Sequence, residues 1–320
     1  MPATLLVSRR LPPEVEARAA RSYSARLNAA DEPYSADRLI ELARDAEGLL
    51  VCPGNVIDAA LIARLPASVR IVATYSVGYD HIDVKAATAR GLVVTNTPEV
   101  LTDATADIAI LLMLSAARRA GEGERLLRAG TWDGWKPTQL LGTHISGKRL
   151  GILGMGRIGQ AVARRARGFD MQIHYSDIRR LPPEREQGAT FHATPEALLP
   201  HADVLSLHMP GGAGTARFLN AARLEMLPKG AIVVNSARGT LVDDDALIAA
   251  LKSGRIAAAG LDVFANEPHL NPGYLGLENV CLLPHLGSAT VDTRNAMGFR
   301  ALDNLDAFFA GRTPPDRVTG

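Results

Sequence analysis

The stretch RLGILGMGRIG, residues 149–159, decides the fold of this chain. Its first five residues form the apolar run of a buried strand, and its last six form a GxGxxG that leads into apolar residues at helical spacing. The next expected strand ends at Asp177, 18 residues after Gly159. A glycine-rich turn between a strand and a helix, followed about 20 residues later by an acidic residue, is the fingerprint of a dinucleotide-binding α/β unit.

Each part of this fingerprint has a physical role toward NAD. Gly154 permits the tight turn, Gly156 lets the backbone approach a pyrophosphate, and Gly159 lets the helix pack closely on the strand. The helix N-terminus supplies amide donors and a favourable dipole for the phosphates. The predicted contacts of this loop with the cofactor therefore include its other three residues, Met155, Arg157 and Ile158.

The residues after the next strand bear on the choice between NAD and NADP. Asp177 can accept hydrogen bonds from the ribose hydroxyls of NAD and would repel the 2′-phosphate of NADP. Arg179 and Arg180 lie close enough in sequence to neutralise that phosphate if their loop turns inward. The sequence favours NAD and leaves NADP open. A glycine-rich turn without ligand, or a surface acid near a turn, would be the structural alternatives.

Outward from the fingerprint, short apolar runs alternate with helical patterns, as in parallel α/β sheets. Expected strands in the second part of the chain are residues 150–153, 171–175, 204–207, 231–235, 258–261 and 280–283. Those in the first part are residues 5–7, 49–51, 69–73 and 92–94. Expected helices include residues 13–20, 35–46, 102–118 and 289–310. Continuous apolar strands predict sheets covered on both faces.

Composition narrows the class of protein. The 320 residues carry a net charge of +1 with acids and bases mixed, which gives no support for nucleic-acid binding or a basic membrane anchor. Cys52 and Cys281 stand far apart, as expected of reduced thiols. The longest apolar run, residues 108–114, is too short for a membrane span, and the N-terminus lacks a signal-peptide pattern. We expect a soluble cytoplasmic protein, and no residue is assigned to a metal.

Several further motifs occur in a fixed order between about residues 70 and 290. They are SVGYDHID (76–83), TNTP (95–98) with LTDATAD (101–107), WDGW (132–135), NSARG (235–239) with LVD (241–243), LDVF (261–264) with NEP (266–268), and LPHLGSAT (283–290). Together with the GxGxxG, they resemble the D-isomer-specific 2-hydroxyacid dehydrogenases, and most closely the glyoxylate/hydroxypyruvate reductase branch. The first 65 residues match only in pattern.

The resemblance implies an α/β fold of two Rossmann-like domains. Residues 1–99 and 287–320 would form a flavodoxin-like substrate domain, and residues 100–286 an inserted NAD(P)-binding Rossmann domain, with the active site between them. Members of the family are usually homodimers. The implied activity is NAD(P)H-dependent reduction of a small 2-keto acid to the D-2-hydroxy acid, and the reverse oxidation.

That reaction needs a cation or amides for the carboxylate, polarisation of the carbonyl, and a proton donor. His285 follows an expected strand end and would give the proton, because imidazole titrates near neutral pH. Glu267 would orient it and stabilise its charged form. Arg238 presents a planar fork suited to a carboxylate. The alternative interpretation of Arg238 is a structural ion pair, and that of Glu267 is a surface acid without a catalytic role.

The resemblance carries over further contacts. Backbone amides at Val77 and Gly78 would bind the substrate carboxylate, beside Arg238 and His285. Additional cofactor contacts would come from Thr105, His208, Met209, Pro210, Thr215, Ser236, Ala237, Arg238, Asp262, His285 and Gly287. Trp135 matches a tryptophan that, in this branch, can reach the partner subunit's pocket and restrict substrate size, and an aromatic buried in a dimer interface explains it equally well.

Two alternatives remain at this stage. Phosphoglycerate, phosphite and formate dehydrogenases share much of the scaffold, but the chain ends soon after its last helix, without a regulatory domain, and formate dehydrogenases usually carry glutamine at the place of Glu267. An NAD-sensing corepressor-like binding protein is the alternative from another functional class. The intact Arg238, Glu267 and His285 argue against it.

Overall fold

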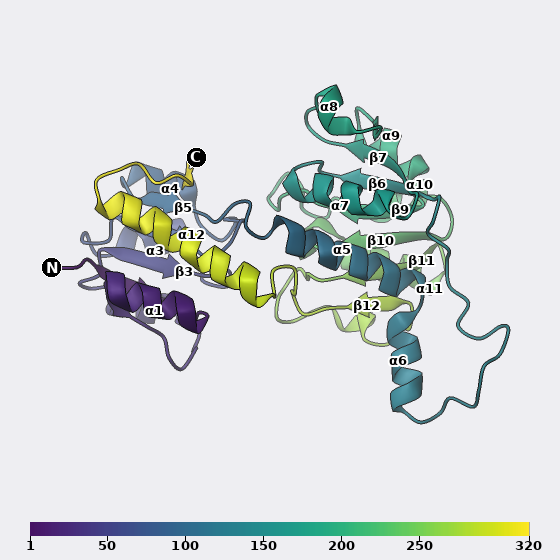
Figure 1. The fold of residues 1–320 in the computed structure, drawn as a ribbon, viewed down its shortest axis with the longest axis horizontal. Helices are drawn as coiled ribbons and strands as arrows, with labels where there is room; N and C mark the ends of the chain where they lie inside the picture. Colours follow the sequence, from purple (N-terminus) through teal and green to yellow (C-terminus); the bar gives the residue numbers. More distant parts are fainter. Residues whose placement is uncertain (320) are drawn as a thin grey trace. The chain divides into compact units, whose positions relative to one another are not determined.

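The computed structural model describes residues 1–319, which fold into two compact units (Figure 1). Unit 1 comprises residues 1–101 and 289–319, and unit 2 comprises residues 102–288. Each unit contains its own sheet, of six strands in unit 1 and seven strands in unit 2. The α/β fold class predicted from the sequence is confirmed.

The sheet of unit 1 has the strand order β13-β5-β4-β3-β1-β2. Its first five strands in sequence are parallel and follow the flavodoxin-like order 2-1-3-4-5, while β13 pairs antiparallel with β5. The strands are β1 (Thr4–Val7), β2 (Ser24–Arg26), β3 (Gly48–Val51), β4 (Ile71–Thr74), β5 (Val93–Thr95) and β13 (Arg317–Val318).

Helices cover both faces of this sheet because its strands bury alternate apolar residues on opposite sides. Leu6 packs with α2, α3 and α4, whereas Leu5 and Val7 pack with α1 and α12. The helices are α1 (Pro13–Ser22), α2 (Ala36–Leu42), α3 (Ala59–Arg64), α4 (Val84–Ala89) and α12 (Val291–Phe309). Unit 1 thus has two cores, one on each side of its sheet.

The sheet of unit 2 is entirely parallel, with the order β12-β11-β10-β9-β6-β7-β8. In sequence terms its first six strands follow the doubly wound order 3-2-1-4-5-6, and the order reverses between β6 and β9. The strands are β6 (Arg149–Leu153), β7 (Gln172–Ser176), β8 (Thr190–Phe191), β9 (Val204–Leu207), β10 (Ala231–Asn235), β11 (Ile256–Leu261) and β12 (Val280–Leu282).

Two cores lie on the two faces of this sheet as well. One contains the buried sides of α5 and α7, and the other contains those of α9, α10 and α11. The helices are α5 (Thr102–Ala117), α6 (Ala120–Arg128), α7 (Arg157–Arg167), α8 (Pro183–Glu186), α9 (Pro195–Leu198), α10 (Ala221–Met226) and α11 (Asp244–Lys252). Short 3-10 turns span Leu199–His201, Gly239–Leu241 and Pro272–Tyr274. In Figure 1, α6 and the loop after it project from the rest of unit 2.

The structure differs from the sequence prediction mainly at the ends of elements. The strand expected at residues 69–73 starts at Ile71, and the helix expected at 35–46 ends at Leu42. The sequence missed β2, β8 and β13, which have only two or three residues. Their residues are largely exposed, so they lack the apolar run that marks a central strand.

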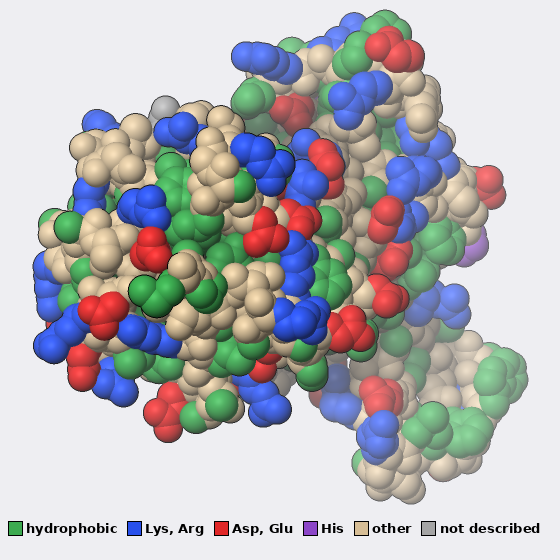
Figure 2. Space-filling model, turned by 60° about the vertical axis from the view of Figure 1, so that its left-hand side comes forward, with side chains coloured by type: hydrophobic (Ala, Val, Ile, Leu, Met, Phe, Trp, Pro, Cys, Tyr) green, Lys and Arg blue, Asp and Glu red, His purple; other side chains and the backbone are tan. Residues whose placement is uncertain are grey.

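The surface carries both signs of charge. On the face shown in Figure 2, Lys and Arg side chains alternate with Asp and Glu, without a large field of one sign. Within residues 1–319, no helix combines the length and the apolar character that crossing a membrane requires.

We predict that Gly260→Ala destabilises unit 2, because a Cβ there would lie 2.8 Å from both Cβ and the carbonyl oxygen of Leu112 in α5. Overpacking of this kind costs about 1–3 kcal/mol. Urea unfolding followed by circular dichroism measures the loss. The matched control is Gly276→Ala, where no atom lies within 4 Å of the added methyl group. An equal loss in the two variants would refute this account of how α5 packs on β11.

Candidate active site

The loop after β6 meets the loop after β9 where the strand order reverses. Gly154 has φ +93°, and a Cβ on it would lie 2.7 Å from the carbonyl carbon of His208 and 2.8 Å from the nitrogen of Met209. Only glycine therefore allows the two loops to come so close. In open α/β sheets, ligands bind in the crevice at this reversal point.

The other two glycines of the motif, Gly156 and Gly159, differ in their surroundings. Gly156 is the N-cap of α7, and no atom lies within 4 Å of a Cβ placed on it, so its backbone is open to a ligand. Gly159 packs so closely that a Cβ would lie 2.2 Å from the carbonyl oxygen of Gly154. A tight turn, an open backbone at a helix N-terminus and close packing behind it fit the pyrophosphate of a dinucleotide. Arg157 and Ile158 open that helix.

Asp177 follows β7 and lies against the glycine-rich loop. Its Oδ2 atom accepts a hydrogen bond of 2.6 Å from the Met155 amide. Arg180 points to a different partner, since its guanidinium donates two hydrogen bonds to the Glu186 carboxylate, which also accepts one from the Tyr175 hydroxyl. The Arg180 and Tyr175 donors lower the pKa of Glu186 to about 2. Arg180 thus forms an ion pair with Glu186.

The loop after β9 contains the predicted residues His208, Met209, Pro210 and Thr215. His208 Nε2 lies 2.8 Å from the Ser206 hydroxyl, and removal of its ring from water lowers the pKa of His208 to about 4. This shift favours the neutral form of the ring. Thr215 donates its hydroxyl to the carbonyl of Pro210 at 2.9 Å, which closes the loop on itself.

Asn235, the last residue of β10, shapes the turn that carries Arg238. Its side-chain oxygen accepts a hydrogen bond of 3.0 Å from the Ala237 amide, and its Nδ2 donates to the carbonyl of Arg238 at 2.9 Å. Within residues 1–319, the buried hydroxyl of Ser236 has no hydrogen-bond partner. A buried polar atom without a partner is costly, so this hydroxyl is suited to a ligand.

The same turn packs against the loop that carries Glu267. A Cβ on Gly239 would lie 1.9 Å from the carbonyl carbon of Phe264 and 2.3 Å from the nitrogen of Ala265. The backbones of the two loops therefore touch at a position where only glycine fits. This contact fixes the spacing between the two loops of Arg238 and Glu267.

Asp262 holds the turn that carries His285. Its side chain is fully buried, and its two carboxylate oxygens accept hydrogen bonds from the amides of Leu286 at 2.6 Å and Gly287 at 2.8 Å. Burial raises the pKa of the Asp262 carboxyl, while these amide hydrogen bonds oppose the rise. The Thr105 hydroxyl donates to the carbonyl of Gly287 at 3.1 Å, which attaches the turn to α5.

His285 and Glu267 form a direct pair. His285 Nδ1 lies 2.7 Å from Glu267 Oε2, and Glu267 Oε1 accepts a hydrogen bond of 2.9 Å from the Phe264 amide. Burial raises the pKa of Glu267, but the His285 and Phe264 hydrogen bonds and the charge of Arg238 outweigh it, so this pKa lies below its usual value. An ionised carboxylate on Nδ1 leaves Nε2 as the ring atom for proton exchange with a ligand.

In unit 1, Val77 and Gly78 follow β4. Both of their carbonyl oxygens accept hydrogen bonds from side chains. Asn96 Nδ2 donates to the carbonyl of Val77 at 2.8 Å, and the Ser76 hydroxyl donates to the carbonyl of Gly78 at 2.6 Å. Among the backbone–backbone hydrogen bonds of the described residues, none is donated by the amides of Val77 and Gly78. Backbone amides of neighbouring residues in a turn can bind an anion.

Asn235 is the site residue that sequence reasoning missed. Its signal was present, because an Asn whose side chain accepts from the amide two residues later is a common turn former.

The structure brings Arg238, Glu267 and His285 onto neighbouring loops of unit 2, at the carboxyl ends of β10, β11 and β12.

Comparisons with known proteins agree with this geometry. Residues 110–287 match the family model "D-isomer specific 2-hydroxyacid dehydrogenase, NAD binding domain". Glycerate dehydrogenase of Hyphomicrobium methylovorum is 45% identical over 309 residues, which are 96% of each chain. Glyoxylate reductase of Thermococcus litoralis is 44% identical over 284 residues, which are 88% of this chain and 86% of that protein.

A solved structure is also similar. The NADPH-dependent glyoxylate/hydroxypyruvate reductase of Sinorhizobium meliloti, in complex with NADP and malonate, is 38% identical, with a TM-score of 0.90. The match covers 99% of this chain and 97% of that one.

We predict that His285→Asn raises the pKa of Glu267, because the variant removes the ring hydrogen bond and charge while burial remains. Carboxyl-detected NMR titration of Glu267 measures the shift. His144→Asn, which changes an exposed histidine elsewhere in unit 2, is the control. An unchanged or lower pKa in His285→Asn would contradict the pairing.

Proposed function

Since this chain belongs to the D-isomer-specific 2-hydroxyacid dehydrogenases, we propose that it reduces glyoxylate or hydroxypyruvate to the D-2-hydroxy acid and catalyses the reverse oxidation. Its relatives include proteins named glyoxylate reductase and glycerate dehydrogenase. The observation that carries the proposal is the 2.7 Å pair of His285 and Glu267 beside the turn of Arg238.

His285 is the proposed proton donor for the carbonyl oxygen of the keto acid. Its Nδ1 faces the Glu267 carboxylate, which fixes the ring orientation and stabilises the charged imidazolium. Nε2 then delivers the proton as negative charge develops on the substrate oxygen. In the reverse oxidation the same atom accepts the proton from the hydroxyl.

Arg238 is the proposed anchor for the substrate carboxylate and carbonyl. Its backbone is held by Asn235, and the close contact of Gly239 with Phe264 keeps its turn beside the Glu267 loop. A guanidinium offers two parallel donors to a carboxylate. From the family resemblance, we assign the amides of Val77 and Gly78 to the same carboxylate. The resemblance also assigns residues 1–99 and 287–320 to a substrate domain and residues 100–286 to a cofactor domain.

The residues at the reversal point of the unit 2 sheet fit NAD. The backbone around Gly156 would hold the pyrophosphate, and Asp177 would accept hydrogen bonds from the adenosine ribose. The unpaired hydroxyl of Ser236 and the turn at Gly287 would complete the nicotinamide end. When bound, the cofactor supplies or accepts the hydride.

NAD is the preferred cofactor in this proposal, and NADP is the alternative. Asp177 places a carboxylate beside the amide of Met155, where it disfavours a 2′-phosphate. Arg180, which could compensate, is occupied by Glu186. The relative from Sinorhizobium meliloti binds NADP, so the assay has to include both cofactors.

The proposed assembly is a homodimer formed through the projecting segment of residues 120–145. Apolar side chains on it are exposed in the single chain, including Leu127 at 61%, Trp135 at 80% and Leu141 at 65%. Figure 2 shows apolar side chains gathered on a projecting part of the surface. A patch of this kind marks a protein interface. Both cysteines are free thiols, which suits a reducing cytoplasm.

The activity test is consumption of NADH or NADPH on addition of glyoxylate, hydroxypyruvate, pyruvate and larger 2-keto acids. We expect glyoxylate and hydroxypyruvate to give the highest kcat/KM, with NADH preferred. His285→Ala should lower kcat by roughly 10²- to 10⁴-fold, because a positioned acid contributes that much. NADH binding, measured by fluorescence, should survive. No turnover with any keto acid in the wild-type protein would refute the reductase and favour a binding protein.

The dimer test is the mass in solution. We expect light scattering to give twice the chain mass of 34.0 kDa. The double variant Leu127→Glu and Leu141→Glu should shift the protein toward the monomer, because it buries charge in the proposed interface. Leu275→Glu changes a leucine that is 68% exposed outside this segment and serves as the control. A monomeric wild-type protein would refute the assembly.

A further inference from the structure

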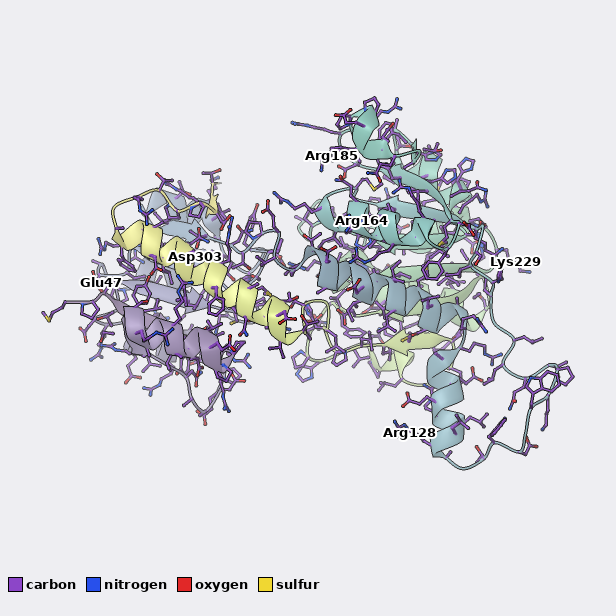
Figure 3. All side chains as sticks on the ribbon, viewed as in Figure 1. Glu47, Arg128, Arg164, Arg185, Lys229 and Asp303 are labelled. Carbon is purple, nitrogen blue, oxygen red and sulfur yellow. The ribbon has the colours of Figure 1, made fainter. Side chains whose placement is uncertain are left out.

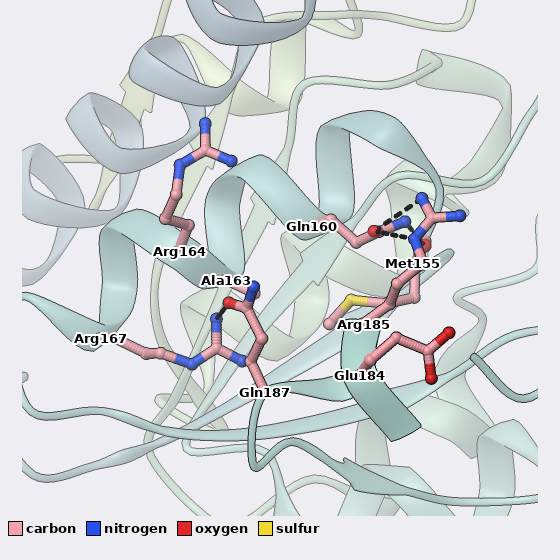
Figure 4. Close-up of a pocket in the computed structure, with 8 residues that line it drawn as sticks. All are labelled: Met155, Gln160, Ala163, Arg164, Arg167, Glu184, Arg185 and Gln187. Carbon is pink, nitrogen blue, oxygen red and sulfur yellow. Dashed lines mark hydrogen bonds between the residues drawn. The ribbon is translucent and has the colours of Figure 1, made fainter. Parts of the chain in front are cut away.

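We propose that a cavity between α7 and the segment around α8 is a binding site for a phosphate group. The cavity has a volume of about 180 Å³. Its lining includes Met155, Gln160, Arg164, Arg167, Arg185 and Gln187. Figure 4 shows the two sides of this pocket, with Arg167 and Gln187 on one and Gln160, Met155 and Arg185 on the other.

The charges of two arginines in this pocket are not balanced by direct carboxylate partners. Arg185 donates from Nε and Nη2 to the amide oxygen of Gln160, at 3.1 and 2.9 Å. Arg167 donates to the backbone carbonyl of Glu186 at 2.9 Å and to the amide oxygen of Gln187 at 3.3 Å. All of these acceptors are neutral, so two guanidinium groups line one cavity and, in the part of the chain that the structure describes, neither has a carboxylate bonded to it.

Neighbouring arginines show the contrast. Arg165 pairs with Asp103 and Asp107, and Arg180 pairs with Glu186. Arg164 lines the cavity but points toward α5, where it pairs with Asp103 at 2.9 Å (Figure 4). Arg167 and Arg185 therefore differ from these three arginines, because their side-chain hydrogen bonds go to neutral acceptors.

A phosphate group matches this arrangement better than a single carboxylate. It carries up to two charges and three terminal oxygens, so it can accept hydrogen bonds from guanidinium groups on both sides at once. Partial burial lowers the pKa of Arg167, in keeping with its hydrogen bonds to neutral acceptors. Glu184 is the one carboxylate in the lining, and its charge opposes an anion.

The pocket adjoins the glycine-rich loop through Gln160 and Met155. Gln160 Nε2 donates to the carbonyls of Met155 at 2.8 Å and Gly156 at 3.1 Å. The amide of Met155 in turn donates to Asp177. The phosphate group can therefore come from two sources, a free phosphate compound or the 2′-phosphate of NADP. The experiment has to separate these two.

The test is isothermal titration with inorganic phosphate, with sodium chloride adjusted to constant ionic strength. Saturating NADH is present throughout, so that the glycine-rich loop is covered while the pocket remains available. We expect Arg185→Gln and Arg167→Gln each to raise the Kd for phosphate about tenfold, as expected for loss of a charge-assisted hydrogen bond. Lys229→Gln is the control, because Lys229 is an exposed cation of unit 2 that lies away from this pocket (Figure 3).

Glu184→Gln gives a change in the opposite direction. Removal of its negative charge should tighten phosphate binding severalfold, a gain that a misfolded variant could not produce. The proposal is overturned if the wild-type protein with NADH binds no phosphate, or if Arg185→Gln binds it as tightly as the wild type. It is also overturned if Glu184→Gln binds phosphate more weakly.

Replacement of NADH by saturating NADPH identifies the source of the phosphate. Loss of phosphate binding with NADPH assigns the pocket to the 2′-phosphate of the cofactor. Retention of phosphate binding with NADPH assigns it to a separate phosphate compound. Both results depend on binding alone, so they stand apart from the keto-acid assay and from any failure of the proposed reduction.

Discussion

The carboxylate of Asp262 is the constraint on which the candidate active site depends. A fully buried carboxylate is costly unless its oxygens are hydrogen-bonded, and here both oxygens accept backbone amides from the turn after β12. That turn includes His285, whose φ of +55° is uncommon for a residue with a side chain. The two amide hydrogen bonds that satisfy the buried Asp262 carboxylate also fix the path of the turn that carries His285.

Close backbone contacts complete the arrangement at the carboxyl ends of the strands. Gly154 meets the loop of His208, and Gly239 meets the peptide between Phe264 and Ala265, at distances that exclude a side chain. Parallel strands bring the loops to one edge of the sheet, and glycines let neighbouring loops touch there. The glycine-rich loop and the loops of Arg238, Glu267 and His285 thus lie along one edge of the sheet.

The sequence predicted the features that depend on burial or on residues close together in the chain. Strands such as β6 and β9 were predicted as apolar runs, because all of their residues except Arg149 are buried. The GxGxxG was found because its residues are contiguous in the sequence. The pairing of His285 with Glu267 came from family resemblance, since the two residues are 18 positions apart and lie on separate loops. Two features were not predicted, because each depends on the path of a loop. They are the ion pair of Arg180 with Glu186 and the two hydrogen bonds that the Asn235 side chain makes with the turn of Arg238.

The pair of His285 and Glu267 is poorly suited to a structural role. Its side chains are 45% and 36% exposed, and exposed ion pairs contribute only about 0–1 kcal/mol to stability. Yet the Phe264 amide, the buried Asp262 and the contact of Gly239 all act to hold it in place. Strong buried interactions that fix a weak exposed pair are expected where the geometry of the pair serves proton transfer, because preorganised groups need no rearrangement in the transition state.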